Sequence, residues 1–221
     1  MLEDRLNSLK KRMLSYVSLI KEMIRKSIDS LLNEDESLAR EVITELEPKA
    51  NEEEIAVEEE CIALIALYQP EAKELRIVMM ISKMVSDIER MGDKAVNIAE
   101  SAIELIGKPK IKPYIDIPRM TEETLKMIDD SIYSFINEDV CLAYEVLKKD
   151  DIVDDLRDQI LRELISFMSS DPKTIEPSLH LLRIARNLEK IADITSNICE
   201  DVVYISEGKV IKHHYPDECQ S

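Results

Sequence analysis

An internal repeat limits the possible folds of this chain more than any other feature of its sequence. The segment 33–42, NEDESLAREV, returns 104 residues later as NEDVCLAYEV. The segment 89–100, ERMGDKAVNIAE, returns 100 residues later as EKIADITSNICE. Because two separate segments recur at nearly the same interval, we predict that the chain consists of two copies of one structural unit.

Both copies show the apolar spacing of amphipathic helices, with alternating steps of three and four residues. In the first copy this spacing predicts a helix from residue 6 to about 33, a second over 36–68 with a break at Pro48, and a third over 71–106. In the second copy the apolar sets lie over 125–135, 142–168 and 181–205. Short connections make consecutive helices antiparallel neighbours. The predicted fold is all-α, with two tandem antiparallel three-helix bundles related by internal duplication.

A proline-containing segment separates the two copies. Residues 107–118, GKPKIKPYIDIP, contain three prolines and no helical pattern. We therefore expect a first bundle over 1–107, a linker over 108–118, and a second bundle with a short polar tail over 119–221. Gly107 and Gly208 each follow the last periodic residue of a predicted helix, where a left-handed glycine commonly ends the helix.

Composition removes several classes of fold and function. Three glycines are too few for a β-sandwich, barrel or propeller, which need many tight turns. With 46 acidic against 29 basic residues, the net charge of −17 argues against binding to nucleic acid or to anionic lipid. The amphipathic, charged N-terminus is unlike a signal peptide, and no uncharged run reaches the roughly 20 residues of a membrane span. We expect a cytoplasmic protein with no direct membrane insertion.

The cysteines carry little chemical information. Cys61, Cys141, Cys199 and Cys219 are far apart and have no zinc-ligand spacing. The first three lie in apolar helical stretches, where we expect reduced, buried side chains that act as small hydrophobic groups.

Rows of oxygen-bearing side chains run along the outside of the predicted helices. Relative to the core positions Ile88 and Leu188, the third helix of each copy carries an outward row, and the second helix offers a pair with the same four-residue spacing. The rows are Glu89, Asp93 and Asn97, with Glu47 and Asn51 in the first copy, and Glu189, Asp193 and Asn197, with Asp150 and Asp154 in the second. Side by side, such rows form a patch of carboxylate and amide oxygens, which are ligands for hard cations such as iron, manganese, magnesium or calcium.

The alternative is that these acids are only solvated, because like-charged pairs cost little on a wet helix. The internal comparison favours function. The outward Glu, Asp and Asn are identical in the two copies, whereas core residues differ, as in Met91 against Ile191. A face that only needs water should vary faster than the core.

The same segments resemble a known family. SDIERMGDKAVNIAE and RNLEKIADITSNICEDVVYISEGKVIKHH are similar to the duplicated signature of the PhoU family, and EEECIALIALYQPEAKELRIV is similar to the segment that precedes it. The resemblance covers nearly the whole chain. It implies paired three-helix bundles, metal clusters held by surface carboxylates, and a regulatory role without catalysis.

The resemblance assigns the metal ligands to Glu89 with Asp93, Glu189 with Asp193, Asp150 with Asp154, and Glu47 with Asn51. Asn51 replaces the usual acid, and Pro48 follows Glu47 directly. We therefore expect the second bundle to hold metal more tightly. The expected cofactors are divalent or trivalent ions, with iron preferred and zinc, manganese or magnesium as alternatives.

The function implied is negative regulation of phosphate uptake and phosphate-starvation signalling. The implied partners are the ATPase subunit of a phosphate ABC transporter and a membrane sensor kinase, and exposed amphipathic faces favour a homodimer. Three alternatives stay open: an accessory protein of a simpler phosphate permease, a metal-dependent enzyme acting on phosphate compounds, and a purely structural helical module. No nucleophile, general base or phosphate loop is recognisable in support of an enzyme.

Overall fold

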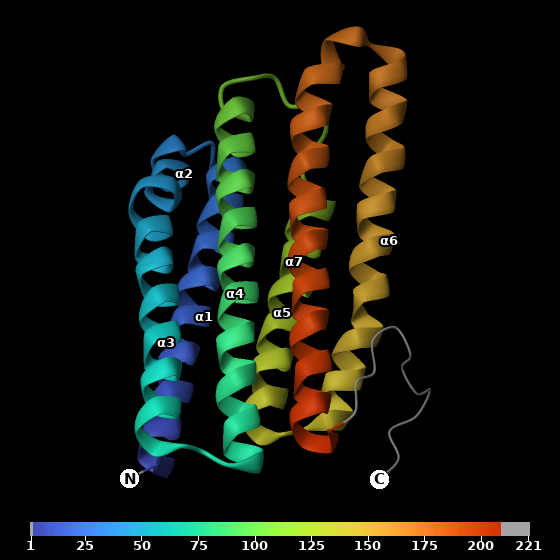
Figure 1. The fold of residues 1–221 in the computed structure, drawn as a ribbon. Coiled ribbons are helices and arrows are strands. Elements are labelled where there is room, and N and C mark those ends of the chain that lie inside the picture. Colours follow the sequence, from blue (N-terminus) through green and yellow to red (C-terminus); the bar gives the residue numbers. More distant parts are fainter. Residues whose placement is uncertain (1, 209–221) are drawn as a thin grey trace.

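The computed structural model describes residues 2–208 and shows an all-helical molecule (Figure 1). In the first repeat, the helices are α1 (Leu2–Asn33), α2 (Glu36–Glu41), α3 (Glu47–Tyr68) and α4 (Ala72–Leu105), with the π-helix η1 (Val42–Leu46) between α2 and α3. In the second repeat they are α5 (Asp116–Asn137), α6 (Val140–Ser170) and α7 (Ile175–Glu207), with the 3₁₀ turn η2 (Pro172–Thr174) before α7. The predicted fold class is confirmed.

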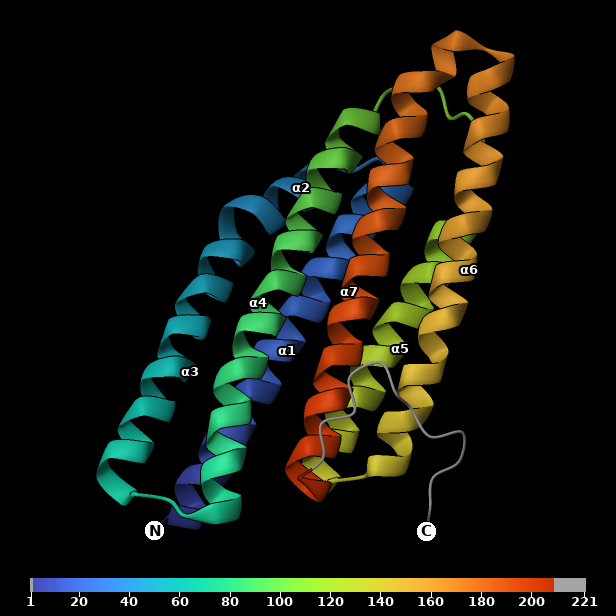
Figure 2. The same cartoon turned by 45° about the vertical axis from the view of Figure 1, so that its right-hand side comes forward.

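The two repeats lie side by side, joined along the antiparallel helices α4 and α7 in the middle of the molecule (Figures 1 and 2). Helices α1 and α3 pack against α4, and α5 and α6 pack against α7. The apolar residues of the two bundles form one continuous core, to which α1 and α5 also contribute through their mutual contact. The pairing of α4 with α7 places the outward rows of both repeats on either side of one seam.

Pro48 does not break the second helix of the first repeat, contrary to our expectation. A proline removes one backbone donor, and its ring crowds the carbonyl four residues earlier. The wider turn of η1 precedes it, and Pro48 occupies the first turn of α3, where a missing donor is tolerated. Glu47 therefore keeps a helical position beside α4.

The second repeat begins earlier than its apolar pattern indicated. Helix α5 starts at Asp116, so Ile117 and Pro118 belong to its first turn rather than to the linker. Proline fits the first turn of a helix because its N–H would have no partner there. The proposed domain limits themselves stay a prediction.

The repeated helix ends have the same local structure. Asp35 and Asp139 accept hydrogen bonds from the backbone N–H of Ser37 and Leu142, and so cap the starts of α2 and α6. Gly107 and Gly208 have φ values of 76° and 69°, which confirms their predicted left-handed conformation at the ends of α4 and α7.

No helix within residues 2–208 has the length and apolar character needed to traverse a bilayer. Cys61 and Cys199 are buried free thiols as expected, but Cys141 is exposed on α6 and disulfide-bonded, so the expectation of a reduced, buried side chain was wrong there. Cys219 and the polar tail lie outside the described residues.

Candidate metal centre: facing carboxylates on both bundles

The first repeat brings carboxylates of α3 and α4 together on the bundle surface. Burial, followed by the charges of Asp93 and Glu100, raises the pKa of Glu47. Burial also raises the pKa of Glu54, with contributions from Glu58 and Asp93, and that of Glu89, with contributions from Asp93 and Glu54. The charges of these side chains therefore act on one another where α3 packs against α4. Glu47, Glu54, Glu89 and Asp93 are called the first carboxylate cluster below.

A buried tyrosine on α1 lies next to this cluster. Tyr16 has no exposed surface, and its hydroxyl has no hydrogen-bond partner among the described residues. Its pKa is raised strongly by burial and then by the charges of Glu54, Glu89 and Asp93. A buried hydroxyl without a partner carries a desolvation cost of about 1–3 kcal/mol. A bound water or ion at the cluster would supply the missing contact.

The second repeat places carboxylates of α6 against those of α7. Burial, followed by the charges of Asp193 and Asp154, raises the pKa of Asp150 to about 6. Burial raises the pKa of Asp154 as well; Arg157 lowers it and Asp193 raises it again. Asp150, Asp154, Glu189 and Asp193 are called the second carboxylate cluster. All four were predicted as ligands, and the fold brings them together.

Basic side chains partly neutralise the second cluster. The Lys190 Nζ donates to Asp193 Oδ2 at 2.6 Å and to Glu189 Oε1 at 3.4 Å. The guanidinium of Arg157 contacts Asp154 at 3.5 Å and Asp158 at 3.2 Å. The ammonium group of Lys190 thus stands where a metal cation would have to bind Glu189 and Asp193. Metal binding at this cluster requires Lys190 to turn away.

The predicted asparagines are placed differently from the acids. Asn97 accepts a hydrogen bond from Arg183 Nη2 of α7 at 2.7 Å and donates one to the Asp93 carbonyl at 2.9 Å. Its side-chain amide therefore links α4 to α7 across the contact between the two bundles. Asn197 is half-buried beside Asp193, on the wall of a groove described below. Asn51 is exposed on α3.

The residues present fit a hard cation in chemistry, although they do not form a closed ligand shell. Within residues 2–208, no three His, Cys, Asp or Glu side chains are arranged so that they could hold a metal ion. Burial and repulsion by neighbouring acids raise the pKa values of five of these side chains, and a bound cation would relieve the repulsion; the five are Glu47, Glu54, Glu89, Asp150 and Asp154. Metal binding therefore stays a prediction, with ten candidate ligands and one added by the structure.

That added residue is Glu54, which sequence reasoning missed. Glu47, Asn51, Glu54 and Glu58 follow steps of four, three and four, so they form one stripe along α3. Continuing from the predicted pair Glu47 and Asn51 by three residues along the same helix face would have identified Glu54 from the sequence. Glu54 adds a carboxylate to the first cluster, whereas the second cluster has Arg157 as an internal counterion. This lessens the reason for expecting tighter binding in the second bundle.

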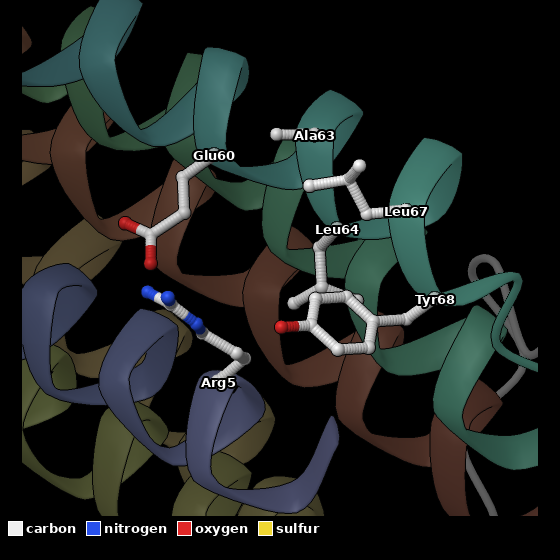
Figure 3. Close-up of a pocket in the computed structure, with 6 residues that line it drawn as sticks. All are labelled: Arg5, Glu60, Ala63, Leu64, Leu67 and Tyr68. Atoms are coloured by element: carbon white, nitrogen blue, oxygen red, sulfur yellow. The ribbon is translucent and has the colours of Figure 1, made fainter. Parts of the chain in front are cut away.

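A separate hollow lies between α1 and α3, away from both clusters. It has a volume of about 170 Å³ and is lined mainly by apolar side chains of α3. Figure 3 shows Leu64, Leu67 and Tyr68 along one side, with Arg5 and Glu60 pointing toward one another. None of the predicted site residues lines this hollow.

Comparison with known proteins gives one consistent result. A family model described as the PhoU domain matches the chain twice, over residues 13–102 and 117–202. The phosphate-specific transport system accessory protein PhoU homolog of Aquifex aeolicus is 43% identical over 96% of this chain and 96% of its own length. The accessory protein PhoU of Escherichia coli is 32% identical over 96% of this chain and 88% of its own length.

Solved structures agree with the sequence matches. The crystal structure of PhoU from Pseudomonas aeruginosa matches with a TM-score of 0.89 and 31% identity, covering 95% of this chain and all of the other. PhoU from Streptococcus pneumoniae, a phosphate transport system regulatory protein, also has a TM-score of 0.89, with 28% identity over 96% of this chain and 99% of the other. The two repeats of this chain are PhoU domains, and the chain belongs to the PhoU family.

Proposed function

We propose that this chain is a metal-binding accessory protein of phosphate-specific transport that represses phosphate-starvation genes when phosphate is plentiful. The observation that carries the proposal is the tandem pair of PhoU domains over residues 13–102 and 117–202, with relatives over nearly the full length that are described as accessory proteins of this transport system. The facing carboxylate clusters add a chemical feature through which such a protein can act.

The proposed contribution of metal is structural. Once Lys190 has turned away and the carboxylates have moved together, a cation bound by Asp150, Asp154, Glu189 and Asp193 supplies positive charge between α6 and α7. The acids of the first carboxylate cluster hold a second cation between α3 and α4 after a similar movement. Relief of the repulsion fixes each helix pair and creates a surface that a partner protein can bind. We expect iron, with zinc, manganese or magnesium as alternatives.

The proposed partners are the ATPase subunit of a phosphate ABC transporter and its membrane sensor kinase, inside the cytoplasm. A simpler phosphate permease in place of the ABC transporter is the second possibility. The proposal includes no catalytic step, and no nucleic acid. Purified ATPase subunit, sensor kinase and permease should each be tested for binding to the full chain. Binding to the ATPase subunit and the kinase is expected; binding to the permease alone would overturn this choice of partners.

A reporter of a phosphate-starvation gene tests the regulatory role. In a strain that lacks the chain, the reporter should be active even in high phosphate, and the wild-type chain should restore repression. The double substitution Asp150→Asn with Asp154→Asn should fail to restore it, whereas Asp151→Asn, on the exposed side of α6, should succeed. An unchanged reporter in the strain without the chain would contradict the proposed function.

We also propose a homodimer. Helix α3 exposes large apolar side chains, with Ile55 57%, Ile62 68% and Leu67 76% exposed. Exposed apolar side chains of this size along one helix favour a protein contact. Sedimentation of the full chain should give twice the monomer mass, and Ile62→Glu with Leu67→Glu should return it to the monomer. A monomeric wild-type chain at micromolar concentration would contradict this.

A further inference from the structure

The outer side of the seam between α4 and α7 contains a groove of about 500 Å³. Arg90 and Lys94 of α4 and Lys190 of α7 supply three cations to its wall. The remaining wall includes Asp150, Asp193, Asn197, Glu200, Ile194 and Ser196. The groove, called the seam groove below, therefore combines three cationic donors with oxygen acceptors in a protein whose net charge is −17.

One of these cations has no ion-pair partner in the described part of the chain. Arg90 contacts Asp87 at 2.9 Å, and Lys190 is bonded to Asp193. Lys94, which is half-buried, forms no salt bridge with residues 2–208, although its charge lowers the pKa of Glu89. Lys94 and Lys190 face the same groove from two different helices, but only Lys190 has a carboxylate of residues 2–208 at ion-pair distance. An anion in the groove would give Lys94 such a partner.

The two repeats differ in the basic side chain that reaches across the seam between α4 and α7. Arg183 reaches across the seam and donates to Asn97 at 2.7 Å and to Glu100 at 2.9 Å. Lys83 is the residue of the first repeat that corresponds to Arg183, but it donates to the buried Asp201 at 2.5 Å. No basic side chain of the described chain therefore covers Asn197 in the way that Arg183 covers Asn97.

A second, independent observation points to a missing ligand. Ser196 lines the groove and is only 9% exposed, yet its hydroxyl has no hydrogen-bond partner among the described residues. Its neighbour Thr195 bonds the backbone carbonyl of Ile191 at 2.8 Å, as a buried helical hydroxyl commonly does. The Ser196 hydroxyl oxygen itself is buried, so it becomes a donor to a group bound in the groove when rotation about the χ1 angle turns it toward the groove.

The mixture of donors and acceptors selects the kind of anion. A fully deprotonated anion such as sulfate would face the carboxylates of Asp193 and Glu200 without any hydrogen to donate. Hydrogen phosphate at neutral pH keeps a hydroxyl, which can donate to a carboxylate while its other oxygens accept from lysine, arginine and serine. The lining thus favours a tetrahedral oxyanion that carries a proton.

We propose that the seam groove binds free orthophosphate, with Arg90, Lys94, Lys190 and Ser196 as donors and an acidic side chain of α7 as the acceptor of its hydroxyl. The site is formed by both repeats and shares Asp150 and Asp193 with the second carboxylate cluster. It would let the chain sense phosphate directly, which goes beyond the regulatory role proposed above. It does not depend on bound metal.

Equilibrium dialysis of the full chain with radiolabelled orthophosphate tests this, after metal has been stripped by a chelator and at constant ionic strength. The informative variants are Lys94→Gln and Ser196→Ala. Lys126→Gln, an exposed lysine of α5, is the matched control for the change of charge. Competition by unlabelled sulfate and by phosphoserine shows whether a hydroxyl-bearing anion is preferred, and whether a phosphoryl group on a larger molecule can enter.

Wild type and Lys126→Gln should bind orthophosphate equally. Lys94→Gln should bind at least about tenfold more weakly, since a hydrogen bond to a charged group contributes about 1.5–3 kcal/mol and each 1.4 kcal/mol is tenfold. Ser196→Ala should bind more weakly as well, and sulfate should compete poorly. Absence of binding by the wild type, or equal loss in Lys94→Gln and Lys126→Gln, would overturn the proposal. Competition by sulfate as strong as by orthophosphate would overturn the choice of a protonated anion, and stronger competition by phosphoserine would overturn free phosphate as the ligand. The stripped chain makes each result independent of the metal-binding proposal.

Discussion

The substitution Asp150→Asn should stabilise the metal-free protein above neutral pH, although it removes a proposed ligand. Burial and the carboxylates of Asp193 and Asp154 raise the pKa of Asp150 from its ordinary value of 3.8 to about 6. The folded chain therefore holds this proton more tightly than the unfolded chain does. The wild type loses stability as pH rises from about 4 to 6, and the loss stays constant above that range.

The magnitude follows from the difference between the two pKa values. Each pKa unit corresponds to about 1.4 kcal/mol, so a difference of about two units sets an upper limit near 3 kcal/mol. Asp150 is only partly buried and solvent screens its neighbours, so we expect about 1–2 kcal/mol. An amide of the same shape carries no charge and avoids this cost.

Urea unfolding followed by circular dichroism, in chelator and at pH values from 4 to 8, measures the effect. The stability of Asp150→Asn relative to the wild type should increase between pH 4 and 6 and then stay level up to pH 8. Asp151→Asn, on the exposed side of the same helix, should show no such rise. A variant that is neutral or destabilised at pH 8 would refute the reasoning that the second carboxylate cluster is electrostatically strained.

Three further predictions concern the fold. Lys83→Met leaves Asp201, which is 5% exposed, without its ion-pair partner and should lower the free energy of unfolding by about 1–3 kcal/mol. Adding Asp201→Asn should recover most of this loss, as measured by urea unfolding. A double-mutant cycle that shows no coupling between the two positions would contradict the pair. Gly92→Leu should lower the free energy of unfolding by at least about 1–3 kcal/mol, because even a Cβ atom at this position would lie 3.0 Å from Ile20 Cδ1. Gly92→Ala should change it by less than about 1 kcal/mol. Equal unfolding midpoints for the two variants would contradict this. Gln69 has a φ of 47°, a left-handed conformation that glycine adopts without strain. Gln69→Gly should therefore stabilise the protein by about 0.5–1 kcal/mol and raise its thermal midpoint. A lowered midpoint would contradict strain at this helix end.

The local structure of the chain could be predicted well from its sequence. The three-and-four spacing of apolar residues located the six long helices of residues 2–208, and the repeated Asn-Glu-Asp turn and the two glycines located several of their ends. These features depend on residues close together in the chain. Pro48 misled this reasoning because the π-turn that accommodates it has no signature in the apolar pattern.

The arrangement of the site was less accessible to sequence reasoning. The four-residue spacing selected Asp150, Asp154, Glu189 and Asp193, which the fold brings together on the adjacent helices α6 and α7. Their role as metal ligands stays a prediction. Tyr16 was missed, since its apolar neighbours made it a core residue and only the packing of α1 shows its hydroxyl near the acids. The pairing of α4 with α7, which forms the seam groove, depends on contacts between the repeats, and periodicity within one helix carries no information about them.

The central claim is that the acidic rows of both repeats bind cations. Elemental analysis of the purified full chain, with its bound metal measured per protein molecule, tests this most directly. We predict a transition metal in the wild type and none in the double substitution Asp93→Ala with Asp193→Ala, whose helical circular dichroism should be nearly unchanged. Equal metal content in the wild type and the double variant would contradict it.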